Sequence, residues 1–252
     1  MILDCLFSGT VKRLYILDYG LFQVAENGRI IGIPGYLIQT DDRNILVDTG
    51  FPAWYAENPE RASLEDDLGS FGRILQLTGE NLPESQLALI GLTSEDVNLL
   101  VMTHTDIDHV GGIGRFPEAK LILGREERAL ERPRYFEDRS PIPWPAGVGC
   151  QLVEQDMELV PGMRLITTPG HSPGHLSILL SLEQEGKVLL TCDAVSRPAE
   201  MEEGFRSAWD PIQAEVSAKR LMKMAAAEGA VIIYGHDPSQ WPSLRKAPEY
   251  YC

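Results

Sequence analysis

Cysteine, histidine and basic side chains are scarce in this sequence of 252 residues, and long apolar runs are absent. The four cysteines stand alone without a CxxC pair, so neither a disulfide framework nor a cysteine-rich zinc site is indicated. No apolar run approaches the roughly 18 residues that span a bilayer. The first residues lack the basic start and the apolar core of a signal peptide. We therefore expect a soluble, cytoplasmic protein with no membrane partner.

The shortage of positive charge leaves a formal net charge of −15. Affinity for nucleic acid depends mostly on Lys and Arg that neutralise phosphates, so this charge opposes a nucleic-acid partner. The hydrophobic fraction of 44% and the charged fraction of 23% are ordinary for a globular protein, and the length suits a single domain over residues 1–252. A small molecule is the expected partner, and the sequence leaves a homodimer open.

The hydrophobic pattern predicts strands interspersed with a few helices. Strands are expected at residues 11–18, at 35–48 as a hairpin turning at 41–44, and at 97–102, 120–123, 152–153, 163–168, 176–182, 188–191 and 230–234. Helices are expected at 84–90, 125–131 and 210–228, the last with Ile212, Val216, Leu221 and Met224 on its apolar face. Two long connections remain, 51–81 and 132–149. Each is either a wall or lid of a binding pocket or ordinary surface structure.

The richest stretch lies at residues 104–109, HTDIDH, directly after the strand expected at 97–102. It places two imidazoles and two carboxylates within six residues. All five histidines of the chain lie in loops of this kind, which follow or join expected strands. An isolated histidine is more often structural, but the joint pattern favours a shared site. Imidazole and carboxylate together suit zinc, manganese or iron.

Other polar side chains also end expected strands. His171 and His175 lie in the loop Thr168-Pro-Gly-His-Ser-Pro-Gly-His, Asp193 follows the strand at 188–191, and His236 follows the strand at 230–234. Strand ends at one edge of a sheet bring such loops together. Asp48, before Thr49-Gly50, has two interpretations: it caps its own turn, or it orients a ligand imidazole through the other ring nitrogen.

The order of these motifs carries a family resemblance. HxDxDH at 104–109, Asp48-Thr-Gly, Pro169-Gly-His171, Asp193 and Gly235-His236 resemble the metallo-β-lactamase superfamily, whose motif HxHxDH is followed by His, Asp and His. The resemblance spans nearly the whole chain. It implies an α/β fold, a four-layer αββα sandwich with a dinuclear metal site at one edge. The stretches 168–177, 188–194 and 235–237 are most similar to the N-acyl-homoserine lactone lactonases.

The resemblance also implies a ligand set for two divalent metal ions. A first metal would be held by His104, Asp106 and His171, a second by Asp108, His109 and His236, and both would share Asp193. Zinc is the first expectation, with iron or manganese as alternatives. Asp106 departs from the family, which has a second histidine there. The extra carboxylate favours iron or manganese over zinc, or leaves that site weakly occupied.

The implied activity is hydrolysis of a lactone or a related ester. A metal-bound hydroxide would attack the lactone carbonyl, and Asp108 would carry the proton to the departing alkoxide. Ser196 occupies the position of a tyrosine that polarises the carbonyl in the lactonases, and it is too short to replace a phenol. The substrate preference is therefore open. His175 is expected to be structural or to orient a ligand, and Cys192 to face the core.

Other functions remain open. A thioesterase of the glyoxalase II type would share the fold. A di-iron redox module would explain the carboxylate at Asp106, because flavodiiron oxidoreductases carry one there, but their flavodoxin domain is missing from this chain. A degenerate protein could bind metal without turnover.

Overall fold

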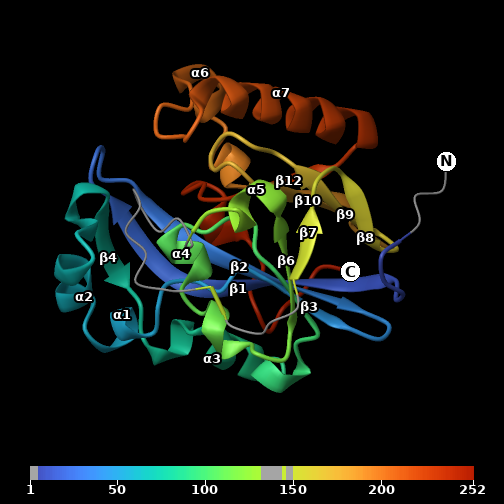
Figure 1. Cartoon of the computed structure of the whole chain (residues 1–252), viewed down its shortest axis with the longest axis horizontal. Coiled ribbons are helices and arrows are strands. Elements are labelled where there is room, and N and C mark those ends of the chain that lie inside the picture. Colours follow the sequence, from blue (N-terminus) through green and yellow to red (C-terminus); the bar gives the residue numbers. More distant parts are fainter. Residues whose placement is uncertain (1–4, 132–143, 146–149) are drawn as a thin grey trace.

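The computed structural model describes residues 5–131, 144–145 and 150–252. Two β-sheets pack face to face, and helices cover their outer faces (Figure 1). Three layers of apolar side chains hold the elements together: one beneath the first sheet, one between the sheets, and one under the longest helix. The predicted four-layer α/β sandwich is confirmed.

The first sheet has seven strands. Their order is β4 (Gly72–Gln76), β1 (Val11–Val24), β2 (Ile30–Thr40), β3 (Asn44–Val47), β5 (Leu99–Val101), β6 (Lys120–Gly124) and β7 (Cys150–Val153). The pairs from β4 to β3 are antiparallel, and those from β3 to β7 are parallel. The predicted hairpin at 41–44 is confirmed, because Gln39 pairs with Asn44 across it. The sequence did not predict the second hairpin, in which β1 extends to Val24 before β2 returns.

The second sheet has five strands. Their order is β12 (Val231–Tyr234), β11 (Gly186–Cys192), β10 (Leu176–Leu182), β9 (Met163–Thr167) and β8 (Met157–Val160). Only β8 was not predicted. The amide of Gln240 closes the outer edge of β12: it accepts a hydrogen bond from Tyr234 N at 3.0 Å and donates one to Ile232 O at 2.8 Å.

The helices are short except for one. They are α1 (Trp54–Glu57), α2 (Pro59–Glu65), α3 (Pro83–Ala88), α4 (Ile107–Val110), α5 (Arg125–Arg128), α6 (Glu200–Glu203) and α7 (Pro211–Glu228). Single 3-10 turns lie at Leu68–Ser70, Gly79–Asn81, Ser94–Asp96, Ile113–Arg115, Asp193–Val195 and Trp241–Ser243. The three predicted helices correspond to α3, α5 and α7. No helix in the described ranges has the length and apolar character needed to cross a bilayer.

The predicted apolar face of α7 is confirmed at Leu221 and Met224, which pack against the sheet, and was wrong at Ile212 and Val216. Ile212 and Val216 are 79% and 55% exposed, whereas the buried positions are Ala214, Ser217, Ala218, Leu221 and Ala225. The helix lies close against the backbone of the 168–175 loop: Ser217 donates a hydrogen bond to Pro169 O at 2.6 Å. Only small side chains fit between the helix and this loop. The space available there, and not hydrophobicity, therefore decides which residues face the loop.

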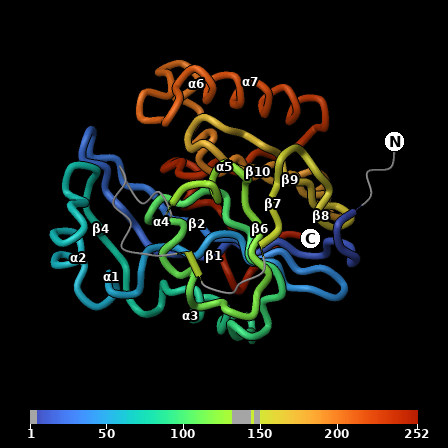
Figure 2. The backbone as a smooth tube through the Cα atoms, viewed as in Figure 1, coloured from blue at the N-terminus to red at the C-terminus, as the bar shows by residue number. Residues whose placement is uncertain are grey.

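Of the two long connections, residues 51–81 are described in full, whereas only residues 144–145 of the second are. Residues 51–81 form α1, α2 and the edge strand β4, which pairs with β1. Trp144 packs against the core below the first sheet and donates its Nε1–H to Leu130 O at 2.9 Å. The other aromatic residues of the second connection, Tyr135 and Phe136, lie outside the described residues. Figure 2 shows the carboxyl-terminal segment returning beside β1, where Tyr251 pairs with Leu14.

Candidate metal centre

The loops that carry the predicted site residues meet at one edge of the two sheets. They follow β3, β5, β9, β11 and β12, which end at that edge. All seven residues predicted to bind metal are brought together there, in three groups whose ligand atoms lie within 4.8 Å of one another. The groups are His104, Asp106 and His171; His104, His109 and Asp193; and Asp108, His109 and His236.

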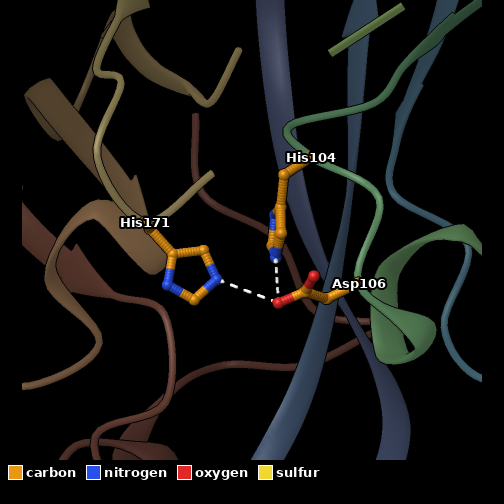
Figure 3. Close-up of side chains that lie close together, drawn as sticks. All are labelled: His104, Asp106 and His171. Carbon is orange, nitrogen blue, oxygen red and sulfur yellow. Dashed lines mark hydrogen bonds and ion pairs between the residues drawn. The ribbon is translucent and has the colours of Figure 1, made fainter. Parts of the chain in front are cut away.

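The first group combines two loops from different sheets. His104 and Asp106 follow β5, and His171 follows β9. Figure 3 shows both imidazoles directed at the Asp106 carboxylate. Asp106 Oδ2 lies 3.2 Å from His171 Nε2 and 3.7 Å from His104 Nε2. The carboxylate thus occupies a position between two ring nitrogens.

The second group lies beside it, with Asp193 between the two. Asp108 Oδ2 lies 3.6 Å from the Nε2 atoms of both His109 and His236. Asp193 Oδ1 lies 3.2 Å from His236 Nε2, while its Oδ2 lies 3.8 Å from His171 Nε2. The two oxygens of one carboxylate therefore face different groups, which is the arrangement that a shared ligand requires.

Asp48 fixes the rings of two histidines. Its carboxylate is buried and accepts hydrogen bonds from Thr103 N at 2.8 Å, from Thr103 Oγ1 at 2.7 Å and from His109 Nδ1 at 2.9 Å. Because the Thr103 hydroxyl donates to Asp48, it accepts from His104 Nδ1 at 3.0 Å. The interpretation that Asp48 merely caps its own turn is wrong. Asp48 holds His109 directly and His104 through Thr103.

Three imidazoles are consequently held through the same ring nitrogen, Nδ1. His236 Nδ1 donates to Gly32 O at 2.8 Å, as the Nδ1 atoms of His104 and His109 donate to Thr103 and Asp48. Each ring thereby turns its Nε2 toward the centre of the site. Among the described residues, the buried Nε2 atoms of His104 and His109 have no hydrogen-bond partner. Buried nitrogens without partners are costly, and a cation at the centre would satisfy them.

His175 has a different role from the four histidines that face the centre of the site. It is fully buried, and its Nε2 accepts a hydrogen bond from Asp193 N at 3.1 Å while its Nδ1 contacts Thr168 Oγ1 at 2.8 Å. Burial lowers the pKa of this imidazole to about 3, so it stays neutral. The prediction that His175 is structural or orienting is confirmed, because it positions the backbone of Asp193. Cys192 is buried between the sheets, as predicted.

The carboxylates give the site a field that attracts cations. Burial alone would lower the pKa of His109, but Asp108, Asp193 and Asp48 outweigh burial and raise it to about 10. Burial also opposes protonation of His236, yet Asp193 and Asp108 raise its pKa to about 9. Groups that hold protons this firmly hold divalent cations by the same attraction. The donor set therefore fits one or more divalent metal ions.

A cavity of about 370 Å³ opens onto these groups. One side is apolar and is formed by Phe22, Val24, Ile31, Phe51 and Phe71, and the other includes Asp106, Asp108, His171, Asp193 and His236. A neighbouring space of about 550 Å³ is lined by charged residues, Arg29, Arg197, Glu203 and Arg206 among them. Ser196 borders both. Residues 51–81 thus contribute Phe51 and Phe71 to a pocket wall.

Sequence reasoning missed several residues that hold the site. Thr103 holds the site from within the motif loop, whereas the carbonyl of Gly32 and the carboxylate of Glu127 contact the site loops from elements that carry no metal-binding motif. Thr103 directly precedes His104, which was a usable signal. Neither Gly32 nor Glu127 has any local pattern that would have identified it.

Comparisons with known proteins agree with this geometry. The family model described as the metallo-beta-lactamase superfamily matches residues 32–236. The N-acyl homoserine lactonase of Bacillus thuringiensis is 35% identical over 96% of this chain and 99% of its own length. N-acyl homoserine lactonase AttM of Azorhizobium caulinodans is 31% identical over 88% of each chain.

Solved structures give the same result. An N-acyl homoserine lactone hydrolase with the product N-hexanoyl-L-homoserine bound at its catalytic metal centre superposes with a TM-score of 0.82. It is 34% identical and covers 96% of this chain and 99% of that one. The predicted resemblance is confirmed on sequence and on structure, and this chain belongs to the metallo-β-lactamase superfamily.

Proposed function

We propose that this protein is a metal-dependent hydrolase that opens the ring of a lactone, an N-acyl homoserine lactone or a related compound. The observation that carries the proposal is the convergence of seven imidazole and carboxylate side chains. Three of the imidazoles turn Nε2 inward because hydrogen bonds hold their Nδ1 atoms from behind. The lactonases among the relatives, which match almost the full chain, support the substrate class.

Two divalent ions would be held by the residues already grouped by geometry. His104, Asp106 and His171 would hold one, Asp108, His109 and His236 the other, with Asp193 shared. Bound there, the metals would supply Lewis acidity and a water molecule of lowered pKa. The carboxylate of Asp106, in place of an imidazole, makes the donor atoms of the first group harder ligands. We therefore infer that manganese or iron competes better with zinc in the first group than in the second.

The chain's own groups perform the remaining tasks. Asp108 lines the cavity, and burial raises the pKa of its carboxyl, so its carboxylate can take a proton and return it to the departing alkoxide of the opened ring. The apolar wall formed by Phe22, Phe51 and Phe71 would exclude water from an acyl chain. No tyrosine is present among the described residues that line the cavity, so Ser196 leaves carbonyl polarisation to the metal centre.

The test combines metal analysis with turnover. The purified protein is analysed for bound metals and assayed on a panel of N-acyl homoserine lactones, simple lactones and a glutathione thioester. We expect two equivalents of divalent metal and ring opening. Replacing His109→Ala should abolish turnover, whereas Glu95→Ala, at an exposed acid far from the site, should not.

Other outcomes would replace the proposal. Hydrolysis of the thioester with inert lactones would indicate the thioesterase alternative. Iron with oxygen consumption and no hydrolysis would indicate a redox module. Full turnover by His109→Ala with metal bound would contradict the ligand assignment.

A further inference from the structure

Glu127 is a buried carboxylate that stands outside the group of metal-binding candidates. It lies in α5 with no exposed surface. Three groups donate hydrogen bonds to it: Thr105 Oγ1 to Oε1 at 2.6 Å, Ser172 Oγ to Oε2 at 2.8 Å, and Gly174 N to Oε2 at 3.1 Å. Both oxygens are thus occupied.

The three donors belong to the two loops that build the first group. Thr105 lies between His104 and Asp106 on the loop after β5, and Ser172 follows His171 on the loop after β9. These loops extend from different sheets, and one backbone hydrogen bond, from Leu176 N to Thr103 O at 2.9 Å, joins them at their bases. The side chain of Glu127 connects them at a second place, beside the ligands of the first group.

The backbone around Glu127 is built for close approach. A Cβ atom on Gly124 would lie 2.0 Å from Gly174 O, and one on Gly174 would lie 2.3 Å from Glu127 N. The start of α5 and the loop after β9 therefore touch through two glycines. This contact holds the start of α5, and with it the backbone of Glu127, against the loop after β9.

A purely structural explanation of this carboxylate is weak. Burying a carboxylate is costly, and the neutral amide of a glutamine would fill the same volume at a lower desolvation cost. No Lys or Arg within the described ranges forms an ion pair with Glu127 to offset that cost. The carboxylate supplies three directed hydrogen bonds, which fix the positions of their donors on the two loops.

The second group has no such connection. His109 is held by Asp48 and His236 by Gly32 O, and Glu127 contacts neither partner. A change at Glu127 should therefore affect the two groups unequally.

We propose that Glu127 is a positioning residue that sets the separation between His104 and Asp106 on one loop and His171 on the other, and so sets the metal affinity of the first group. The inference rests on the metal centre of the proposed function. Residues that orient metal ligands from behind typically contribute tenfold to hundredfold to metal affinity, and we expect a loss of about tenfold here.

The test measures metal binding to each group separately. His236→Ala weakens the second group and leaves the first, whereas His171→Ala weakens the first and leaves the second. Glu127→Gln is introduced into both backgrounds, and zinc affinity is measured by competition with a chromophoric chelator. Glutamine keeps the side-chain volume but replaces one acceptor oxygen with a donor. The matched control is Glu126→Gln, the same chemical change at the exposed neighbouring position.

We expect Glu127→Gln to raise the zinc dissociation constant about tenfold in the His236→Ala background and less than twofold in the His171→Ala background. Glu126→Gln should change neither. An equal loss in both backgrounds would mean a general structural role, and an unchanged affinity in the His236→Ala background would also overturn the inference. Absence of zinc binding by the unmutated protein would instead refute the metal centre itself.

A second pair of variants keeps the inference testable if Glu127→Gln fails to fold. Thr105→Val and Ser172→Ala each remove one hydroxyl donor and leave the carboxylate in place. Each should weaken zinc binding in the His236→Ala background about fivefold, the effect of one lost hydrogen bond. Because both act through Glu127, the double variant should fall short of the product of the two effects. Strictly multiplicative effects would contradict a connection through Glu127.

Discussion

Replacing Asp48→Asn tests whether one buried carboxylate sets the tautomer of the site. Asp48 has a φ of 60°, in the left-handed region that Asn tolerates better than other residues with a side chain, so the backbone should be retained. The new amide oxygen can still accept from Thr103 N. The amide nitrogen would then face the Nδ1–H of His109, and two donors would meet.

The variant has two ways to resolve this conflict, and both weaken metal binding. His109 can move its proton to Nε2, which removes the lone pair aimed at the second group, or it can keep a buried donor without a partner. An unsatisfied buried donor costs about 1–3 kcal/mol, which corresponds to about fivefold to 150-fold in an equilibrium constant. We therefore expect the zinc affinity of the second group to fall about tenfold to hundredfold, in line with losses at similar positions.

The assay is zinc titration of the metal-free protein in the His171→Ala background, with competition by a chelator. Asp41→Asn, an equal charge change at an exposed turn, is the control. Activity of Asp48→Asn in the otherwise unmutated protein should be low at limiting zinc and recover with excess zinc. An affinity within twofold of the Asp41→Asn control would refute the reasoning that Asp48 sets the tautomer.

Three further predictions concern protons, metal preference and packing. With pKa values of about 10 and 9, His109 and His236 are protonated in the metal-free protein at pH 7.5, so zinc binding should release about two protons. The zinc affinity should rise with pH, less steeply above about 9, and level off above about 10. Calorimetry in buffers of different ionisation enthalpy measures the release, and no release would contradict the assigned protonation. Asp106→His should shift the first group toward zinc over manganese, measured by competition between the two ions in the His236→Ala background, and an unchanged ratio would argue against Asp106 as a ligand. Gly170→Ala should destabilise the fold by about 3 kcal/mol in denaturant unfolding, because φ is 137° and the new Cβ would lie 2.3 Å from the Cα of Ala214; the loss should be far smaller for Gly79→Ala, where nothing lies within 4 Å.

The strands with continuous apolar runs could be predicted because burial on both faces leaves a plain signal. The segments 97–102 and 176–182 are of this kind, and the structure has β5 and β10 there. The edge strand β4 could not be predicted, since most of its residues are exposed and its two apolar residues, Ile74 and Leu75, are adjacent and do not alternate with polar ones. The end of β1 was missed for the related reason that Asp18 and Gln23 interrupt the apolar pattern.

The residues of the site that lie at the ends of strands could be predicted from the sequence. A polar residue at a strand's carboxyl end lies at a known edge, so the convergence of His104, His171 and His236 followed from the order of the strands. The residues behind them were not predictable in the same way. Glu127 contacts Thr105 and Ser172 through a hydrogen-bond network between two sheets, and no spacing in the sequence encodes that relation.

The amide of Gln240 has a consequence for the behaviour of the protein in concentrated solution. An open sheet edge can recruit a strand from another molecule, which leads to aggregation. By engaging Tyr234 N and Ile232 O, Gln240 occupies two groups with which an incoming strand would pair. His236 follows Tyr234 by two residues, so the same amide also anchors the end of the strand that leads to a histidine of the metal centre. One neutral side chain thus closes a sheet edge and fixes the strand end next to the site.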